Sequence, residues 1–416
     1  MVEETEETSH DVRLLRSIRL QNILSFGPDT PALELRALNV LIGPNGSGKS
    51  NLLDCLGLLQ SAPEHLAETV RTEGSVQEWL WKGSKNPVAR VEVLVAPTTD
   101  WRPALRYWFE FREVNLRFEL MAERLENAHS QAGYNNPYMF YGYEGGRPIL
   151  NAVDIYADEP MRRSSVEPVG RVKRFLRRED IDPELSILSQ RRDPELYPEL
   201  TYLGDMYRKI RLYREWTFGR SNPARDWQDT AAPNDYLQPD ASNLALMLSR
   251  LRGNPDVKQR IKQELNELYD GITSFDVRVF GGRMQAYLEE SNRIIPASRL
   301  SDGTLRFLSL LVVLLDPTPP PLICLEEPEL GLHPDAVLAI GRLIRESSTR
   351  TQLVVTTHSD ILVDVLGQQP EDIVVCEKHE GQTQLTRLHE EELRGWLERY
   401  SLSELWTKGK LGGTRW

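Results

Sequence analysis

Cysteine is scarce in this 416-residue chain, and the three that occur have no paired spacing. Cys55, Cys324 and Cys376 each lie in an apolar stretch, which predicts core thiols of a reducing compartment rather than a disulfide framework or a zinc site. Glycine and proline number 27 and 26, too few for a collagen-like or low-complexity chain. The chain is therefore an ordinary globular protein, long enough for about two to three domains.

Positively charged residues are also few: the chain has 50 Lys and Arg residues and 62 Asp and Glu residues, so its formal net charge is −12. This balance excludes a protein that coats nucleic acid through bulk charge. The longest apolar run, 307–315, is far shorter than the roughly 20 residues that cross a bilayer. The acidic segment 1–11 is the opposite of a signal peptide. We therefore expect a cytoplasmic protein with no membrane partner.

A glycine-rich segment carries phosphate-binding chemistry. It matches the pattern G-x-x-x-x-G-K-[ST] at every position with Gly43, Pro44, Asn45, Gly46, Ser47, Gly48, Lys49 and Ser50. It follows an apolar strand predicted at 38–42 and opens a helix at Asn51, which we include in the nucleotide-binding set. Glycines let backbone N–H groups face phosphate oxygens, and the helix N-terminus adds partial positive charge. We expect Lys49 to reach the β- and γ-phosphates of a nucleoside triphosphate and Ser50 to bind Mg²⁺.

Acidic residues follow a second apolar strand, predicted at 321–325. An entirely apolar strand is typical of the centre of a parallel sheet, and its C-terminal end is where open α/β sheets bind ligands. We expect Glu326 to hold Mg²⁺ and Glu327 to polarise the attacking water; an acidic loop after a core strand is the plainer alternative. His358 ends a third such run, where its imidazole could bind a γ-phosphate.

Ser301 and Gly303 directly precede an apolar helix predicted over 305–315. A serine and a glycine at a helix start offer a hydroxyl and free backbone donors to an anion, although the same residues make an ordinary N-cap.

A separate cluster of seven cations lies among the 17 residues from Arg162 to Arg178. This cluster could bind a DNA or RNA backbone, and a solvated face paired with acidic residues is the alternative.

In this order, the phosphate loop and the segments LSDGT (300–304), LEEPELGLHP (325–334) and TTHS (356–359) resemble the motifs of ABC-class ATPases. More narrowly they resemble the SMC/RecF/OLD-like branch, which includes stand-alone predicted AAA-type ATPases similar to anti-phage defence ATPases. The segments 18–26 and 402–413 are also similar to parts of that branch. The resemblance implies an α/β ABC-type ATPase head with a mixed or parallel sheet, joined to an α+β insert with a helical part.

The resemblance also implies roles for particular residues. Ser301 and Gly303 match the signature loop, which contacts the ATP bound by a second subunit, and 331–334 matches the D-loop. His358 matches the switch histidine. Gln190 is the candidate for the metal-binding Q-loop glutamine, and an ordinary solvent-facing glutamine is the alternative. Transporter ATPases usually have LSGGQ in the signature and an aspartate at the position of Glu326, so the variant motifs disfavour a transporter. A glutamate still supplies a carboxylate for Mg²⁺.

The expected organisation is an acidic tail (1–11), the N-terminal half of the head (12–87), a β-rich and then helical insert (88–270), and the C-terminal half (271–416). We predict a long loop over 127–147 and a helix over 197–217 inside the insert. The insert lacks the heptads of a coiled-coil arm.

We expect a Mg²⁺-dependent ATPase that forms a homodimer or a higher homo-oligomer around ATP. Its expected role is to control a separate nuclease-like effector chain in anti-phage defence. Two alternatives stay open. One is a RecF-like repair ATPase that binds DNA through the Arg162–Arg178 cluster, and the other is a nucleotide-gated scaffold with little turnover.

Overall fold

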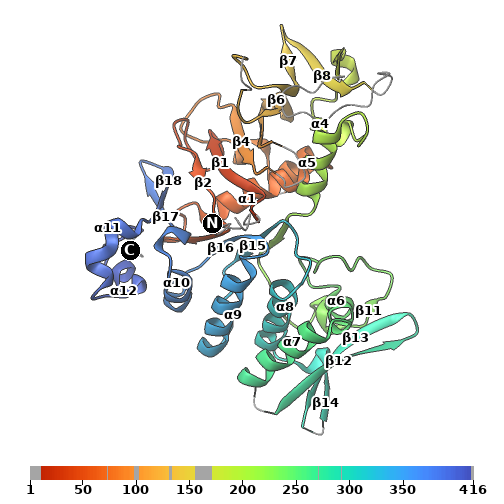
Figure 1. Cartoon of the computed structure of the whole chain (residues 1–416), viewed down its shortest axis with the longest axis vertical. Coiled ribbons are helices and arrows are strands. Elements are labelled where there is room, and N and C mark those ends of the chain that lie inside the picture. The colour runs from red at the N-terminus through yellow and green to blue at the C-terminus, as the bar shows by residue number, and fades with distance from the viewer. Residues whose placement is uncertain are drawn as a thin grey trace, which may run out of the picture. The chain divides into compact units, whose positions relative to one another are not determined.

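The computed structural model describes residues 11–72, 74–97, 103–130, 134–154, 171–269, 271–291 and 293–413 (Figure 1). Residues 1–10 of the expected acidic tail, and Arg162 and Arg163 of the cation cluster, lie outside these ranges. The chain divides into two compact units, and each is described by itself. Unit 1 comprises residues 1–36, 50–210 and 378–384, and unit 2 comprises residues 37–49, 211–377 and 385–416.

Unit 1 is built on an antiparallel sheet of eight strands in the order β2-β1-β4-β5-β6-β7-β8-β9. Alternating burial along β4 and β5 places Tyr107, Phe109 and Phe111 on one covered face, as a half-buried strand requires. Its elements are β1 (Leu15–Gln21), β2 (Leu33–Glu34), α1 (Lys49–Ser61, which begins in unit 2), α2 (Leu66–Thr72), α3 (Val76–Trp79), β4 (Ala89–Val95), β5 (Leu105–Val114), β6 (Arg117–Asn127), β7 (Met139–Glu144), β8 (Arg147–Val153), β9 (Arg171–Phe175), η1 (Arg178–Asp180), α4 (Ile187–Gln190) and α5 (Pro198–Arg208).

Unit 2 contains a six-stranded sheet in the order β10-β15-β16-β3-β17-β18, parallel from β10 to β17. Helices α8, α9 and α10 lie side by side next to it (Figure 1). Its elements are β3 (Leu38–Ile42), β10 (Arg211–Tyr213), α8 (Asp302–Leu314), β15 (Leu322–Glu326), α9 (Pro334–Ser347), β16 (Gln352–Thr356), α10 (Asp360–Leu366), η4 (Pro370–Asp372), β17 (Ile373–His379), β18 (Gln382–Arg387), α11 (Glu390–Leu397) and α12 (Leu402–Thr407).

A smaller antiparallel sheet in unit 2 has the order β11-β13-β12, with β14 paired to β13. Its elements and the helices beside it are η2 (Pro223–Arg225), β11 (Gln228–Asp229), α6 (Leu244–Arg252), α7 (Pro255–Leu268), β12 (Ile272–Phe280), β13 (Arg283–Glu290), β14 (Arg293–Pro296) and η3 (Ala297–Arg299). The buried residues of α6 and α7 share one hydrophobic core with α8, β15 and β16. This shared core places 211–269 in unit 2.

The chain divides into units between residues 210 and 211, and α6 and α7 pack on α8 and β12 within unit 2, while the expected insert bounds 88–270 stay a prediction. Two expectations are corrected by the structure. The predicted loop 127–147 contains β7, which pairs with β6 and β8. The predicted helix 197–217 ends at Arg208, because the following residues form β10 against β15.

The three cysteines are all buried, and none forms a disulfide within the described ranges, as the prediction of core thiols requires. Within the described ranges, no helix has both the length and the apolar character needed to cross a bilayer.

Candidate nucleotide-binding site

Three neighbouring parallel strands in unit 2 end in the three predicted motifs. The order β15-β16-β3 pairs Glu326 with Thr356 and Thr356 with Leu41, so the C-terminal ends of the strands are level. All five residues of β3 and of β16 are buried, as central parallel strands require. The phosphate loop, the acidic segment and the TTHS segment therefore leave the sheet at one edge, the edge at which parallel α/β sheets bind ligands.

The phosphate loop begins at Gly43, where only glycine fits. Its φ is +148°, and a Cβ there would lie 2.2 Å from the carbonyl oxygen of Cys376. Lys49 is buried and its ammonium donates to the carbonyl oxygens of Gly43 (2.9 Å) and Pro44 (3.0 Å). The loop thus folds around the cation that the sequence assigns to phosphate binding.

Burial lowers the pKa of Lys49 below its ordinary value, because an ammonium loses hydration inside the protein. The Cys376 thiol and the carboxylates of Glu327, Glu326 and Glu329 act in the opposite direction. Lys49 therefore lies within electrostatic reach of the acidic segment that follows β15.

Glu326, the last residue of β15, and Glu327, which follows it, differ in their surroundings. Glu326 forms an ion pair with Arg214 at 3.0 Å, and β10, which ends at Tyr213, lies directly beside β15. Glu327 has a left-handed backbone with φ +44°, a conformation that costs a non-glycine residue of order 1–3 kcal/mol. Its N–H donates to the backbone oxygen (3.1 Å) and the hydroxyl (3.2 Å) of Thr356, which hold it in that conformation.

The Glu327 carboxylate is suited to accept a proton. Burial and the neighbouring carboxylates of Glu329 and Glu326 raise its pKa above the usual range for glutamate, against the opposing effect of Lys49 and Arg306. Its Oε1 lies 3.4 Å from Nε2 of His358. The structure thus places the predicted base and the predicted switch histidine in direct contact.

Glu329 links the acidic segment to the switch segment. Its Oε1 accepts hydrogen bonds from the Thr357 hydroxyl (2.6 Å) and from the backbone N–H of His358 (2.9 Å). Together with the bonds from Glu327 to Thr356, these contacts hold the segment after β15 against the segment after β16. His358 is therefore positioned by Glu329.

Removing the Glu329 carboxylate should slow turnover without weakening ATP binding. The variant Glu329→Ala loses both bonds to the switch segment, and we expect kcat to fall about 10-fold while the ATP dissociation constant stays within about 2-fold. The variant Glu329→Gln keeps an amide oxygen that can accept both bonds and loses only the charge that raises the pKa of Glu327, so its kcat should fall much less than that of Glu329→Ala. An unchanged kcat in Glu329→Ala would show that this linkage is not needed for turnover.

Two functional candidates were missed by the sequence analysis. Arg306 is buried in the apolar helix α8, and it donates to the backbone oxygens of Glu327 (3.3 Å) and Trp216. The signal for Arg306 was a lone charge in an apolar helix. Arg214 gave no comparable signal, because its pairing with Glu326 spans 112 positions.

The signature segment is exposed at the start of α8. The Ser301 hydroxyl accepts from the backbone N–H of Thr304 at 3.0 Å, which makes Ser301 the N-cap of the helix. A Cβ on Gly303 would lie 2.9 Å from the carbonyl oxygen of Gly331, so the D-loop backbone packs against this turn. The buried Arg225 pairs with Asp302 and donates to the carbonyl of Leu300 (2.6 Å). The segment is thus rigidly held while Ser301 faces solvent.

Gln190 has a local role in unit 1. Its side-chain oxygen accepts from the N–H of Asp182 (2.9 Å), and its side-chain nitrogen donates to the carbonyl oxygens of Asp182 (3.2 Å) and Leu185 (2.8 Å). An amide engaged in three hydrogen bonds to one turn stabilises that turn. Its contacts give no support to the assignment as a metal ligand.

The described cations of the Arg162–Arg178 cluster are paired with acids or with a tyrosine. Arg171 pairs with Glu199 at 2.6 Å and both side chains are almost fully buried; the other contacts are Lys173 with Glu144, Arg177 with Glu179, and Arg174 with the Tyr197 hydroxyl. Such pairs favour the plainer alternative, an acid-paired face. The side chain of Arg178 is not among the described parts of the cluster.

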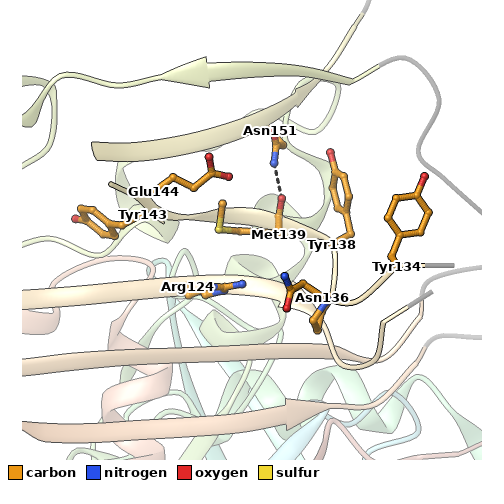
Figure 2. A pocket seen from close by; sticks show the side chains of 9 residues that line it. Arg124, Tyr134, Asn136, Tyr138, Met139, Tyr143, Glu144 and Asn151 are labelled. Carbon is orange, nitrogen blue, oxygen red and sulfur yellow. Dashed lines mark hydrogen bonds between the residues drawn. The ribbon is translucent and has the colours of Figure 1, made fainter. Parts of the chain in front are cut away.

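Unit 1 contains an open pocket of about 490 Å³ between β6, β7 and β8 (Figure 2). Arg124 lies on one side, and Tyr134, Tyr138 and Tyr143 line the rest together with Glu144. Arg124 already pairs with Glu126 at 2.6 Å. The residues that line this pocket belong to none of the nucleotide-binding motifs.

Comparisons with known proteins agree with these motifs. A family model described as "AAA domain, putative AbiEii toxin, Type IV TA system" matches residues 38–88 and 167–364, together more than half of the chain. The chromosome partition protein Smc of Mycobacterium tuberculosis is 34% identical over 84 residues, which make up 20% of this chain and 7% of that protein. The match thus spans a small part of that relative's length.

Solved structures show the same fold at low identity. An Smc head bound to the C-winged helix domain of ScpA has a TM-score of 0.56 and 14% identity, with 91% of this chain and 99% of that chain covered. An Smc head with an extended coiled coil from Pyrococcus furiosus, bound to the C-terminal domain of ScpA, has a TM-score of 0.50 and 14% identity, with coverages of 92% and 98%. The chain therefore belongs to this AAA domain family, and its fold is that of an Smc head.

Proposed function

We propose that this protein is a Mg²⁺-dependent switch that hydrolyses ATP, dimerises around two ATP molecules, and controls a separate effector chain. The observation that carries the proposal is the edge formed by β3, β15 and β16. There the phosphate loop, the Glu326–Glu327 pair and His358 follow three neighbouring parallel strands. An ATPase needs a cation for the phosphates, a carboxylate for the metal and a base for water. Lys49 after β3 is the candidate for the first, and Glu326 and Glu327 at the end of β15 are the candidates for the other two.

The donor set suits Mg²⁺. The Ser50 hydroxyl at the start of α1 and the Glu326 carboxylate are hard oxygen donors, and Mg²⁺ in nucleotide sites is held by few protein ligands together with phosphates and waters. In keeping with such a sparse site, no group of three or more His, Cys, Asp or Glu side chains suited to a metal occurs in the described part of the chain. A bound Mg²⁺ would neutralise charge on the phosphates. Arg214, the present partner of Glu326, would keep that carboxylate oriented.

Hydrolysis follows from the residues around Glu327. Its raised pKa, caused by burial and by neighbouring carboxylates, favours proton uptake from an attacking water. His358, 3.4 Å away, would bind the γ-phosphate and would lose that contact after hydrolysis. Because Glu329 and Thr356 tie the two segments together, this loss would be transmitted to the D-loop at 331–334.

Dimerisation rests on the exposed signature segment. Ser301 and Asp302 are exposed at the N-terminus of the 13-residue helix α8, where backbone N–H groups and the helix dipole favour an anion. We propose that this helix start contacts the ATP held by a second copy of the chain. ATP would then bind the closed dimer better than the open monomers and shift the population between them.

The effector is proposed from the family. Its description names a toxin of a type IV toxin–antitoxin system, and the SMC heads with this fold are described as bound to domains of ScpA. Both support a head that acts on a partner, and a nuclease-like chain in anti-phage defence is the partner we propose.

Specific activity at increasing protein concentration tests this function. The rate of ATP hydrolysis per chain in the presence of Mg²⁺ should rise with concentration until association is saturated, because each chain alone is an incomplete enzyme. Light scattering should report a dimer mass with MgATP and a monomer mass without it. A rate per chain that is constant while the mass stays monomeric would overturn the dimeric mechanism. Absence of any turnover would favour the nucleotide-gated scaffold.

A further inference from the structure

The segment 402–413, here called the C-terminal tail, is firmly attached to unit 2. Its helix α12 starts at Ser401 with a capping box, and Ser403 donates to the Asp364 carboxylate through its N–H (2.9 Å) and its hydroxyl (2.7 Å). Trp406 is almost fully buried in the main hydrophobic core. After α12 the chain folds back, because the Trp406 indole N–H donates to the carbonyl oxygen of Gly413 at 2.9 Å.

Gly413 lies against the phosphate loop. An ideal Cβ on Gly413 would be 3.4 Å from the Cα of Gly43 and 2.9 Å from Cγ1 of Val375. The N–H of Gly413 donates to Oε1 of Glu377 at 2.7 Å. The φ of Gly413 is +59°, which a residue with a side chain rarely adopts. The tail thus brings bare backbone against bare backbone at the first glycine of the loop.

The contacts continue from the tail to the phosphate-binding lysine. Gly43 is held between Gly413 and the carbonyl oxygen of Cys376, to which its own Cβ would come within 2.2 Å. The carbonyl oxygen of Gly43 in turn accepts the ammonium of Lys49 at 2.9 Å. Gly413 therefore contacts Gly43, and Gly43 in turn contacts Lys49, so a shift of Gly413 is expected to shift Lys49.

We propose that the C-terminal tail is a positioning element of the nucleotide site: Trp406 and Glu377 fix Gly413, and Gly413 holds Gly43 in the conformation that the phosphates require. The proposal rests on the phosphate-loop assignment and extends the ATP site to a segment more than 350 positions away in the sequence. A loop that is held in its binding conformation spends less free energy on ordering when the ligand arrives. An intact tail is thus required for tight ATP binding.

A tail that only stabilises the core would behave differently. It would lower the unfolding temperature when altered, and the folded protein would keep its affinity for ATP. The two roles are separated by measuring the ATP dissociation constant by calorimetry and the unfolding temperature without nucleotide on the same full-length variants.

Matched glycine variants provide the first comparison. Gly413→Ala introduces a side chain against Gly43 and Val375, whereas Gly281→Ala introduces one at nearly the same φ, +56°, in a turn with no atom within 4 Å. Both carry the cost of a left-handed alanine. We expect the ATP dissociation constant to rise on the order of 10-fold in Gly413→Ala and to stay unchanged in Gly281→Ala.

Two variants of Glu377 keep the proposal testable if Gly413→Ala does not fold. Glu377→Ala removes the acceptor for the Gly413 N–H and should also weaken ATP binding about 10-fold. Glu377→Gln retains an amide oxygen and should restore most of the affinity. Wild-type affinity in folded Gly413→Ala and Glu377→Ala would overturn the inference. Failure of the wild type to bind ATP would instead overturn the phosphate-loop assignment, so the two failures are distinguishable.

Discussion

Replacing Lys49 by alanine is expected to reduce ATP affinity roughly 10- to 100-fold, because a hydrogen bond to a charged group is worth about 1.5–3 kcal/mol. The ammonium is buried, and its two present acceptors are carbonyl oxygens of the phosphate loop. Burial lowers the pKa of Lys49 because the charged ammonium loses hydration inside the protein. Bound ATP phosphates would stabilise the charged ammonium by direct contact. Calorimetry with ATP, with and without Mg²⁺, measures the loss.

Two control variants accompany Lys49→Ala. Lys49→Met keeps the length of the side chain and removes its charge, so it should lose as much affinity as alanine if charge is the cause. Lys82→Ala removes one lysine from an exposed position in unit 1 and should bind ATP like the wild type. Undiminished affinity in both Lys49 variants would refute the assignment of the phosphate loop.

Glu327→Gln is expected to bind MgATP and to hydrolyse it about 10²- to 10⁴-fold more slowly, the usual contribution of a general base. The amide has nearly the shape of the carboxylate but cannot take a proton from water. The left-handed backbone at this residue is held by Thr356, so the substitution leaves the loop in place. Single-turnover hydrolysis and ATP calorimetry together separate the loss of chemistry from a loss of binding.

The matched control for Glu327→Gln lies two residues further along. Glu329→Gln makes the same chemical change in the same segment, and its hydrogen bonds to Thr357 and His358 can be kept by the amide oxygen. Because the substitution also removes a charge that raises the pKa of Glu327, its turnover should fall below that of the wild type, but far less than that of Glu327→Gln. If Glu327→Gln turned over within a few-fold of the wild type, another group would have to be the base.

The central strands of unit 2 could be predicted because most of their residues are apolar. The strand expected at 38–42 is observed with the same bounds, and its one polar residue, Asn39, is buried and donates to the carbonyl oxygen of Leu353. β10 could not be predicted, because its three residues are a strand only through pairing with β15, more than 100 positions away. β7 is short and half polar, and its pairing with β8 depends on the turn at Gly145 and Gly146.

In the candidate site, too, residues within a local motif could be predicted, whereas residues defined by contacts distant in the sequence could not. Lys49, Glu327 and His358 were identified because each stands in a motif at the end of an apolar strand. Arg214 and Gly413 act through contacts with segments distant in the sequence, Glu326 and Gly43, which no periodicity reveals. Gln190 shows the converse, since the family resemblance made it a candidate metal ligand while its hydrogen bonds stabilise a local turn.

The most direct test of the dimeric switch mixes two inactive variants. Ser301→Arg should block the signature segment and leave ATP binding intact, whereas Lys49→Ala should lose ATP binding and keep its signature segment. A mixed dimer then contains one complete site, formed by the phosphate loop of the first chain and the signature segment of the second. With equal amounts and random pairing, we predict that roughly a quarter of the wild-type activity returns. A mixture as inactive as either variant alone, together with a wild-type rate per chain that does not change with concentration, would contradict a site shared between two chains.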